Sequence, residues 1–127
     1  MMGDISSDIK WLATFESMRS RAVPIMSKIS KASGGSDEEL LKALHEATHE
    51  LPILLKAMHM IPEPLKEEYR KSREDLLKGI ESYFQGCRAH IKWVESRDSL
   101  YLNEGLGCFN EATKKFDSAT SWLTKTK

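Results

Sequence analysis

Apolar residues recur along the chain at alternating spacings of three and four residues, which is the period of an amphipathic α-helix. Four segments carry this pattern, and we expect helices over residues 7–31, 37–61, 64–96 and 99–125. No segment shows the alternation of apolar and polar residues that predicts a strand. The expected core stripes are Trp11, Phe15, Met18, Ala22, Ile25 and Ile29; Leu40, Leu44, Ala47, Leu51, Leu54, Met58 and Ile61; Leu77, Ile80, Phe84, Cys87, Ile91 and Val94; and Leu102, Leu106, Phe109, Thr113, Phe116, Thr120 and Leu123.

Capping residues mark where these helices begin. Residues 6–8 (Ser-Ser-Asp) supply N-cap side chains for the first helix. Ser36 and Glu39 form a capping box at the start of the second. Pro64 suits the first turn of the third helix, because its missing N–H is not needed there. Asp98, or Ser99 beside it, is expected to cap the fourth.

Four amphipathic helices joined by short connections pack most simply as an antiparallel up-down-up-down bundle, here a single domain over residues 1–127. Pro24 and Pro52 lie inside two of the helices and are expected to bend them. Beside the apolar stripe of the fourth helix runs a second stripe, of small residues. It would let a neighbouring helix approach closely and consists of Gly105, Cys108, Ala112 and Ala119.

Composition narrows the classes of partner. The 127 residues include 19 Lys and Arg against 19 Asp and Glu, so the formal net charge is zero. This balance argues against a generally basic nucleic-acid binder. The sequence shows no signal-peptide pattern and no apolar run of the length that a membrane span needs. With only two cysteines, we expect a cytoplasmic protein with reduced thiols and with neither nucleic acid nor membrane as a partner.

One short motif carries candidate chemistry. Residues 45–49 read His-Glu-Ala-Thr-His, and histidines four apart on a helix share a face. These five residues resemble the zincin metallopeptidase signature. The resemblance implies that His45 and His49 would ligate zinc and that Glu46 would act as the base, in a zinc-dependent hydrolase with a third ligand elsewhere.

The helical period favours a different interpretation of the same residues. If Leu44, Ala47 and Leu51 face the core, then His45 and His49 project outward. A catalytic zinc needs a shaped, partly dry pocket. We therefore interpret the motif as part of a solvated helix face, without a catalytic residue or bound cofactor, and keep the zinc enzyme as the alternative.

A weaker alternative metal site involves the cysteines. If the last two helices turn near residue 97, Cys87 and Cys108 lie at one level, and His90 is one turn from Cys87. These three soft ligands suit zinc. The simpler interpretation is that both cysteines are small buried apolar residues.

We therefore predict a non-catalytic helical bundle that acts as a protein–protein interaction or structural module and associates with a protein partner or with itself as a homodimer. The aromatic residues expected at an interaction surface are Trp11, Trp93, Tyr101 and Trp122. A third possibility is a carrier of a small apolar ligand, held where Pro24 and Pro52 splay the bundle.

Overall fold

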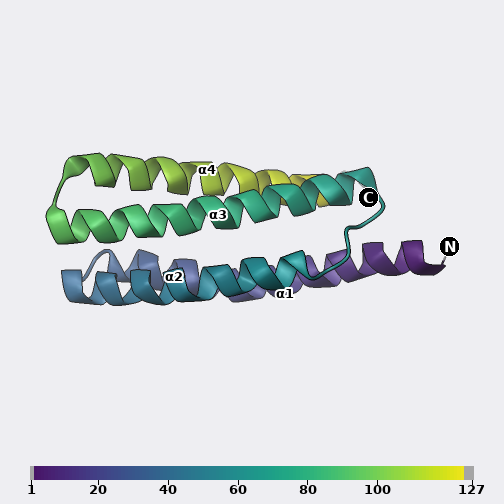
Figure 1. Ribbon diagram of the computed structural model, residues 1–127, viewed down its shortest axis with the longest axis horizontal. Helices are drawn as coiled ribbons and strands as arrows, with labels where there is room; N and C mark the ends of the chain where they lie inside the picture. The colour runs from purple at the N-terminus through teal and green to yellow at the C-terminus, as the bar shows by residue number, and fades with distance from the viewer. Residues whose placement is uncertain (1, 125–127) are drawn as a thin grey trace.

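The computed structural model describes residues 2–124, with side chains from Ser7 onward. They form the helices α1 (Met2–Ala32), α2 (Asp37–His59), α3 (Glu67–Ser96) and α4 (Ser99–Thr124). Successive helices run in opposite directions along one long axis (Figure 1). The prediction of an all-α antiparallel four-helix bundle is confirmed, and the described residues contain no strand. None of these helices is long and apolar enough to cross a membrane.

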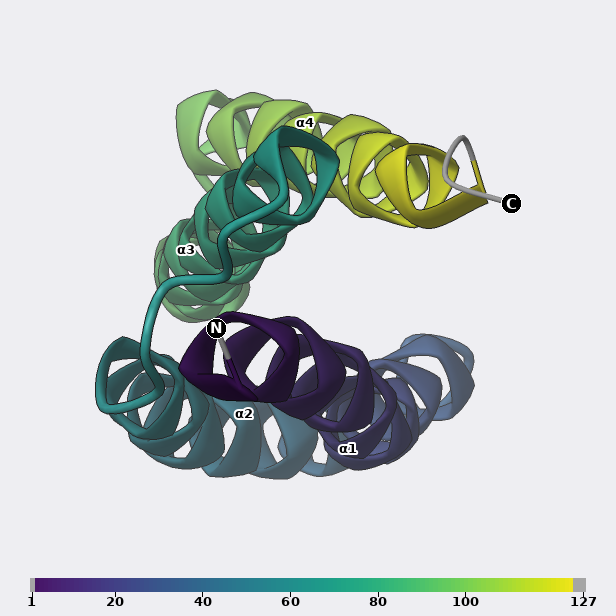
Figure 2. The same cartoon turned by 90° about the vertical axis from the view of Figure 1, so that its right-hand side faces the viewer.

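The four helices form two layers, with α1 and α2 in one and α3 and α4 in the other (Figure 2). The closest packing is between α3 and α4, followed by α2 against α3 and α1 against α2. By contrast, α1 touches α3 only slightly, and the backbones of α1 and α4 are not close neighbours in the described part of the chain. The bundle is therefore open on the side between its first and last helices.

The expected core stripes of the first three helices are found in the interior. In α1, Trp11 is completely buried and Phe15 is nearly so. In α2, every residue of the stripe from Leu40 to Met58 is buried. In α3, Ile80, Cys87 and Val94 are buried, while the other members of its stripe are half-buried. Burial of these stripes removes apolar surface from water, which is the main favourable contribution to folding.

The expected stripe of α4 is only partly in the interior: Phe109, Phe116 and Leu123 are half-buried against the core, but other members differ from the prediction. Leu106 is 48% exposed, and Thr113 and Thr120 are exposed as well. The buried residues of α4 are instead small ones, Gly105, Ala112 and Ala119. This difference arises because α4 packs closely only on α3, where its small stripe is buried and the rings of Phe109 and Phe116 lie against Gly86 and Gly79.

Small residues spaced seven apart line both sides of this α3–α4 contact. The Ser72 hydroxyl donates a hydrogen bond of 2.9 Å to the Ala119 carbonyl, which fixes the register. At the other end, a Cβ on Gly105 would lie 3.3 Å from the Gly86 carbonyl oxygen. A spacing of seven keeps these residues on one face of each helix. The α3–α4 seam consists of Ser72, Gly79 and Gly86 on α3 and Gly105, Ala112 and Ala119 on α4.

Two predicted helix starts differ from the structure. The first helix begins at Met2 rather than at residue 7, and the third begins at Glu67 rather than at Pro64. Both differences involve Asp8, whose carboxylate accepts hydrogen bonds from the Leu65 amide at 2.8 Å and from the Lys66 amide at 3.3 Å. Asp8 therefore stabilises the connection before α3 instead of capping its own helix.

Two other expected caps are present. The Ser36 hydroxyl accepts from the Glu39 amide at 3.2 Å, and the Asp98 carboxylate accepts from the Leu100 amide at 3.0 Å. Pro24 and Pro52 lie inside α1 and α2 without ending them. Both prolines are exposed, so the backbone carbonyls that lose an amide partner there can be hydrated.

Candidate functional site

The motif at residues 45–49 lies on the exposed surface of α2. His45, Glu46 and His49 are all exposed and line an open hollow between α1 and α2. The Glu46 carboxylate lies 3.7 Å from the ammonium group of Lys28 on α1. The remaining residues around the hollow mix apolar and charged side chains: Arg21, Ile25, Glu50 and Leu54.

In the described residues this arrangement lacks the third protein ligand and the enclosed pocket of a zinc hydrolase site. Such a site needs three protein ligands around the metal and a position for water. Within the described residues, no three His, Cys, Asp or Glu side chains are placed to share one ion. Glu46, the base that the resemblance implies, is paired with Lys28 at the rim of an open hollow. The geometry therefore offers a two-histidine surface pair rather than an enclosed catalytic centre.

The second candidate metal site is not assembled either. Cys87 is buried in the core, whereas Cys108 lies beside Gly86 and lines an outer groove with Ser82 and Gln85. The ring of His90 packs against Trp93 and Phe109, with centroids 5.5 Å and 5.3 Å away. Cys108 lies beside Gly86, the neighbour of Cys87 in sequence, but the Cys87 side chain is buried in the core whereas Cys108 lines the outer groove, so the two thiols do not face one site.

The raised pKa values of these thiols disfavour nucleophilic chemistry at neutral pH. Burial raises the pKa of the Cys87 thiol to about 12. Burial, and then the nearby carboxylate of Glu104, raise the pKa of Cys108. Only the thiolate form acts as a ligand or nucleophile. Both cysteines therefore act as small apolar residues at neutral pH.

Burial of His90 predicts a pH-dependent contribution to stability. Burial lowers the pKa of His90 in the folded chain below its ordinary value of 6.5. The unfolded chain then binds this proton at a higher pH than the folded chain, so the free energy of unfolding should fall as pH drops below about 6.5. We expect His90→Gln to flatten this decline, measured by urea unfolding between about pH 7.5 and about pH 5.5. The control is His49→Gln at an exposed position, and an equal flattening in both variants would contradict the assignment to His90.

Trp11, one of the four aromatic residues expected at an interaction surface, lies in the core. Its side chain has 0% exposure and packs edge-on against Phe15, with ring centroids 5.9 Å apart. Its indole N–H has no hydrogen-bond partner among the described residues. We therefore assign Trp11 to the core and not to a surface.

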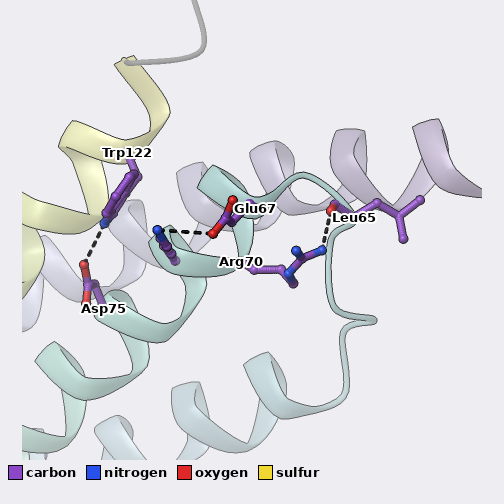
Figure 3. Close-up of polar contacts among 6 residues, drawn as sticks. Leu65, Glu67, Arg70, Asp75 and Trp122 are labelled. Atoms are coloured by element: carbon purple, nitrogen blue, oxygen red, sulfur yellow. Dashed lines mark hydrogen bonds and ion pairs between the residues drawn. The ribbon is translucent and has the colours of Figure 1, made fainter.

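The other three aromatic residues are half-buried and held by contacts within the chain. Trp122 donates from its indole nitrogen to Asp75 at 3.1 Å, as Figure 3 shows, and the Lys71 ammonium lies 4.6 Å from its ring centroid. Near the other end of the hairpin, the Arg97 guanidinium lies 4.6 Å from the ring of Trp93, and Lys92 lies 5.6 Å from that of Tyr101.

These aromatic residues do not form one surface patch. Tyr101 and Trp122 are on the same helix, α4, near its two ends. At 1.5 Å per residue, their backbones are separated by roughly 30 Å. Trp93, Tyr101 and Trp122 therefore each contact neighbouring residues of the α3–α4 hairpin. They do not together make a docking surface.

An apolar groove lies on the open side of the bundle. Arg19 is the only charged residue among those that line it. Its volume of about 150 Å³ is smaller than a typical small-molecule pocket of roughly 300–1,000 Å³, so it gives little support to the ligand-carrier alternative. The groove is lined by Phe15, Met18, Arg19, Ala22, Val23 and Met26 from α1, by Leu76 from α3, and by Phe116 and Thr120 from α4.

Exposed apolar side chains extend along this open side. On α1, Ile9 is 59% exposed, Leu12 40% and Val23 49%. None of these three residues belongs to the core stripe expected for the first helix or to the expected interaction surface. Ile9 and Leu12 are three residues apart and Val23 follows eleven residues later, so all three lie near one face of the helix, which matters only because α4 leaves this face of α1 uncovered.

Comparisons with known proteins give no further guidance. No family model, curated protein or solved structure matches the chain. Any proposal about function therefore depends on the geometry described above.

Proposed function

We propose that this protein is a non-catalytic helical module that works by associating with a second copy of itself through the open face between α1 and α4. The observation that supports this proposal most strongly is that three large apolar side chains of α1, Ile9, Leu12 and Val23, are left exposed beside the apolar groove. Contiguous exposed apolar surface is typical of sites where another protein binds.

Two further features support a second copy as the occupant. The chain has zero formal net charge, so two copies do not repel each other over long distances. The groove contains a single charged side chain, Arg19, and its neighbour Glu16 lies 3.9 Å away with the opposite charge. A surface that carries both charges side by side is able to pair with an identical surface. We also propose a cytoplasmic location, in keeping with the two free cysteines.

The association is tested with a pair of matched variants. Val23 on α1 and Ile53 on α2 are both β-branched, lie inside helices, and are 49% and 44% exposed. We expect Val23→Asp to abolish association, because a carboxylate would then be buried in an apolar interface. Ile53→Asp should leave association unchanged. The molar mass of each protein is measured by light scattering and by sedimentation velocity over a range of concentrations.

Two results would contradict the proposed interface. A wild-type chain that stays monomeric up to about 1 mM, where a dimer held by about 4 kcal/mol is half-formed, would overturn the proposed self-association. A dimer that Val23→Asp leaves intact would place the interface away from this face of α1. Circular dichroism melts of both variants test whether a loss of association is caused by unfolding.

A further inference from the structure

A continuous stripe of exposed and half-buried residues runs along the side of α1 that does not face the core. We call it the outer stripe. Its members follow one another at spacings of three and four residues, which is the period of a coiled-coil seam. The two charged side chains at its centre are well exposed, Glu16 at 71% and Arg19 at 64%. The outer stripe consists of Ile9, Leu12, Glu16, Arg19, Val23 and Met26.

The outer stripe is complementary to its own reverse, because its apolar positions are the same from both ends and its two charges are opposite. It has two apolar residues, then an acid and a base, and then two apolar residues. When two identical helices pair antiparallel about a two-fold axis, each residue faces the one equally far from the axis on the other copy. With the axis between Ser17 and Met18, Glu16 faces Arg19 of the second copy, and Leu12 faces Val23 of the second copy. The same axis sets Ile9 against Met26.

We propose that two copies pair through antiparallel α1 helices in this register, with two reciprocal Glu16–Arg19 contacts at the centre and apolar layers on either side. This inference rests on the proposed self-association and names its geometry. Each apolar residue meets another apolar residue, and each charge meets its opposite. The alignment also matches the layers of an antiparallel coiled coil, in which the two core positions of the repeat face each other.

The surroundings of the outer stripe suit a second helix. On the side away from the core, the flanking positions carry short uncharged side chains, Ala13, Ser20 and Ser27, which let another helix approach closely. On the other side lies the apolar groove, and Arg19, Val23 and Met26 belong both to it and to the outer stripe. A second α1 seated on the outer stripe would therefore cover the edge of the groove on the open side of the bundle.

The central charges distinguish this arrangement from its alternatives. Parallel pairing of two α1 helices in register would set Glu16 against Glu16 and Arg19 against Arg19, which like-charge repulsion disfavours. A partner of unrelated sequence would gain nothing from a stripe that is symmetric about its own centre. The symmetry of the outer stripe therefore points to a second copy of this chain.

Charge reversal tests the register. Glu16→Arg leaves four positive charges at the centre of the pair, and Arg19→Glu leaves four negative charges. We expect each single variant to form its own dimer at least tenfold more weakly than the wild type. A mixture of the two variants should form a heterodimer close to wild-type strength, and the double variant Glu16→Arg, Arg19→Glu should recover the homodimer. Sedimentation velocity on the separate and mixed proteins measures all four.

The mixture of the two charge variants distinguishes the effect of Glu16–Arg19 contacts between chains from the effect of the contact within one chain. Glu16 and Arg19 also pair within α1 at 3.9 Å, and both single variants lose that pair. Mixing does not restore it, so recovery in the mixture reports only on contacts between the chains. A wild-type dimer whose two charge variants fail to recover on mixing would overturn this register and leave the proposed function standing. A wild-type monomer would overturn both.

Discussion

Replacing Trp11 by alanine should lower the free energy of unfolding by about 3–5 kcal/mol, the usual cost of removing a buried aromatic side chain. Trp11 has 0% exposure and packs against Phe15 in the core between the helices. A domain of this kind is stable by only about 5–15 kcal/mol. The variant should therefore be partly unfolded well below the melting temperature of the wild type. Urea unfolding followed by far-ultraviolet circular dichroism measures the loss.

Two control variants separate a core role from a surface role. Trp93→Ala removes the same side chain from a half-buried position and should cost about 1 kcal/mol. Trp11→Phe should cost less than Trp11→Ala, because the ring is kept and the lost indole N–H has no partner among the described residues. If Trp11→Ala kept full stability and instead lost self-association, Trp11 would be an interface residue and its placement in the core would be wrong.

The core of the first three helices could be predicted because each buries its large apolar side chains on one stripe. A three- and four-residue spacing identifies such a stripe directly, as it did for Leu44, Leu51 and Leu54. The period gives the direction of the buried face and depends little on the neighbouring helix. Four helices with short connections then leave few possible arrangements.

The interior of α4 could not be predicted in the same way. Two adjacent stripes on this helix are compatible with burial, and large apolar residues usually identify the right one. Here the small residues are the fully buried ones, and the glycines of α3 make room for the rings of Phe109 and Phe116 at the edge of the contact. Gly79 and Gly86 carry this information, but it is interpretable only once the register against Ala112 and Gly105 is known.

The proposed interface shows a similar limit. The order of residues in the outer stripe is fully present in the sequence, yet a surface helix and an interface helix share the same pattern of polar and apolar positions. What distinguishes them is the position of α4, which does not cover α1. Likewise, Asp8 is a typical capping residue in sequence, and only the fold shows that it serves the amides of Leu65 and Lys66.

The close approach of α3 and α4 predicts opposite effects for two glycines of α4. A Cβ at Gly105 would lie 2.8 Å from Nδ1 of His90 and 3.3 Å from the Gly86 carbonyl oxygen, whereas a Cβ at Gly107 would have nothing within 4 Å. Leucine in place of a helical glycine gains roughly 0.7–1 kcal/mol in helix propensity at either position. Gly107→Leu should therefore stabilise the chain by about that amount.

Gly105→Leu should instead destabilise the chain by about 3 kcal/mol or more, because the added side chain has no space unless the two helices separate. Separation would also strain the hydrogen bond from Ser72 to the Ala119 carbonyl, which depends on the same close contact. Urea unfolding of the two variants at one protein concentration measures the difference between two sites on the same helix. Equal stability of Gly105→Leu and Gly107→Leu would mean that α4 does not approach α3 through its small residues. The register of the α3–α4 seam would then be wrong at its Gly86–Gly105 end.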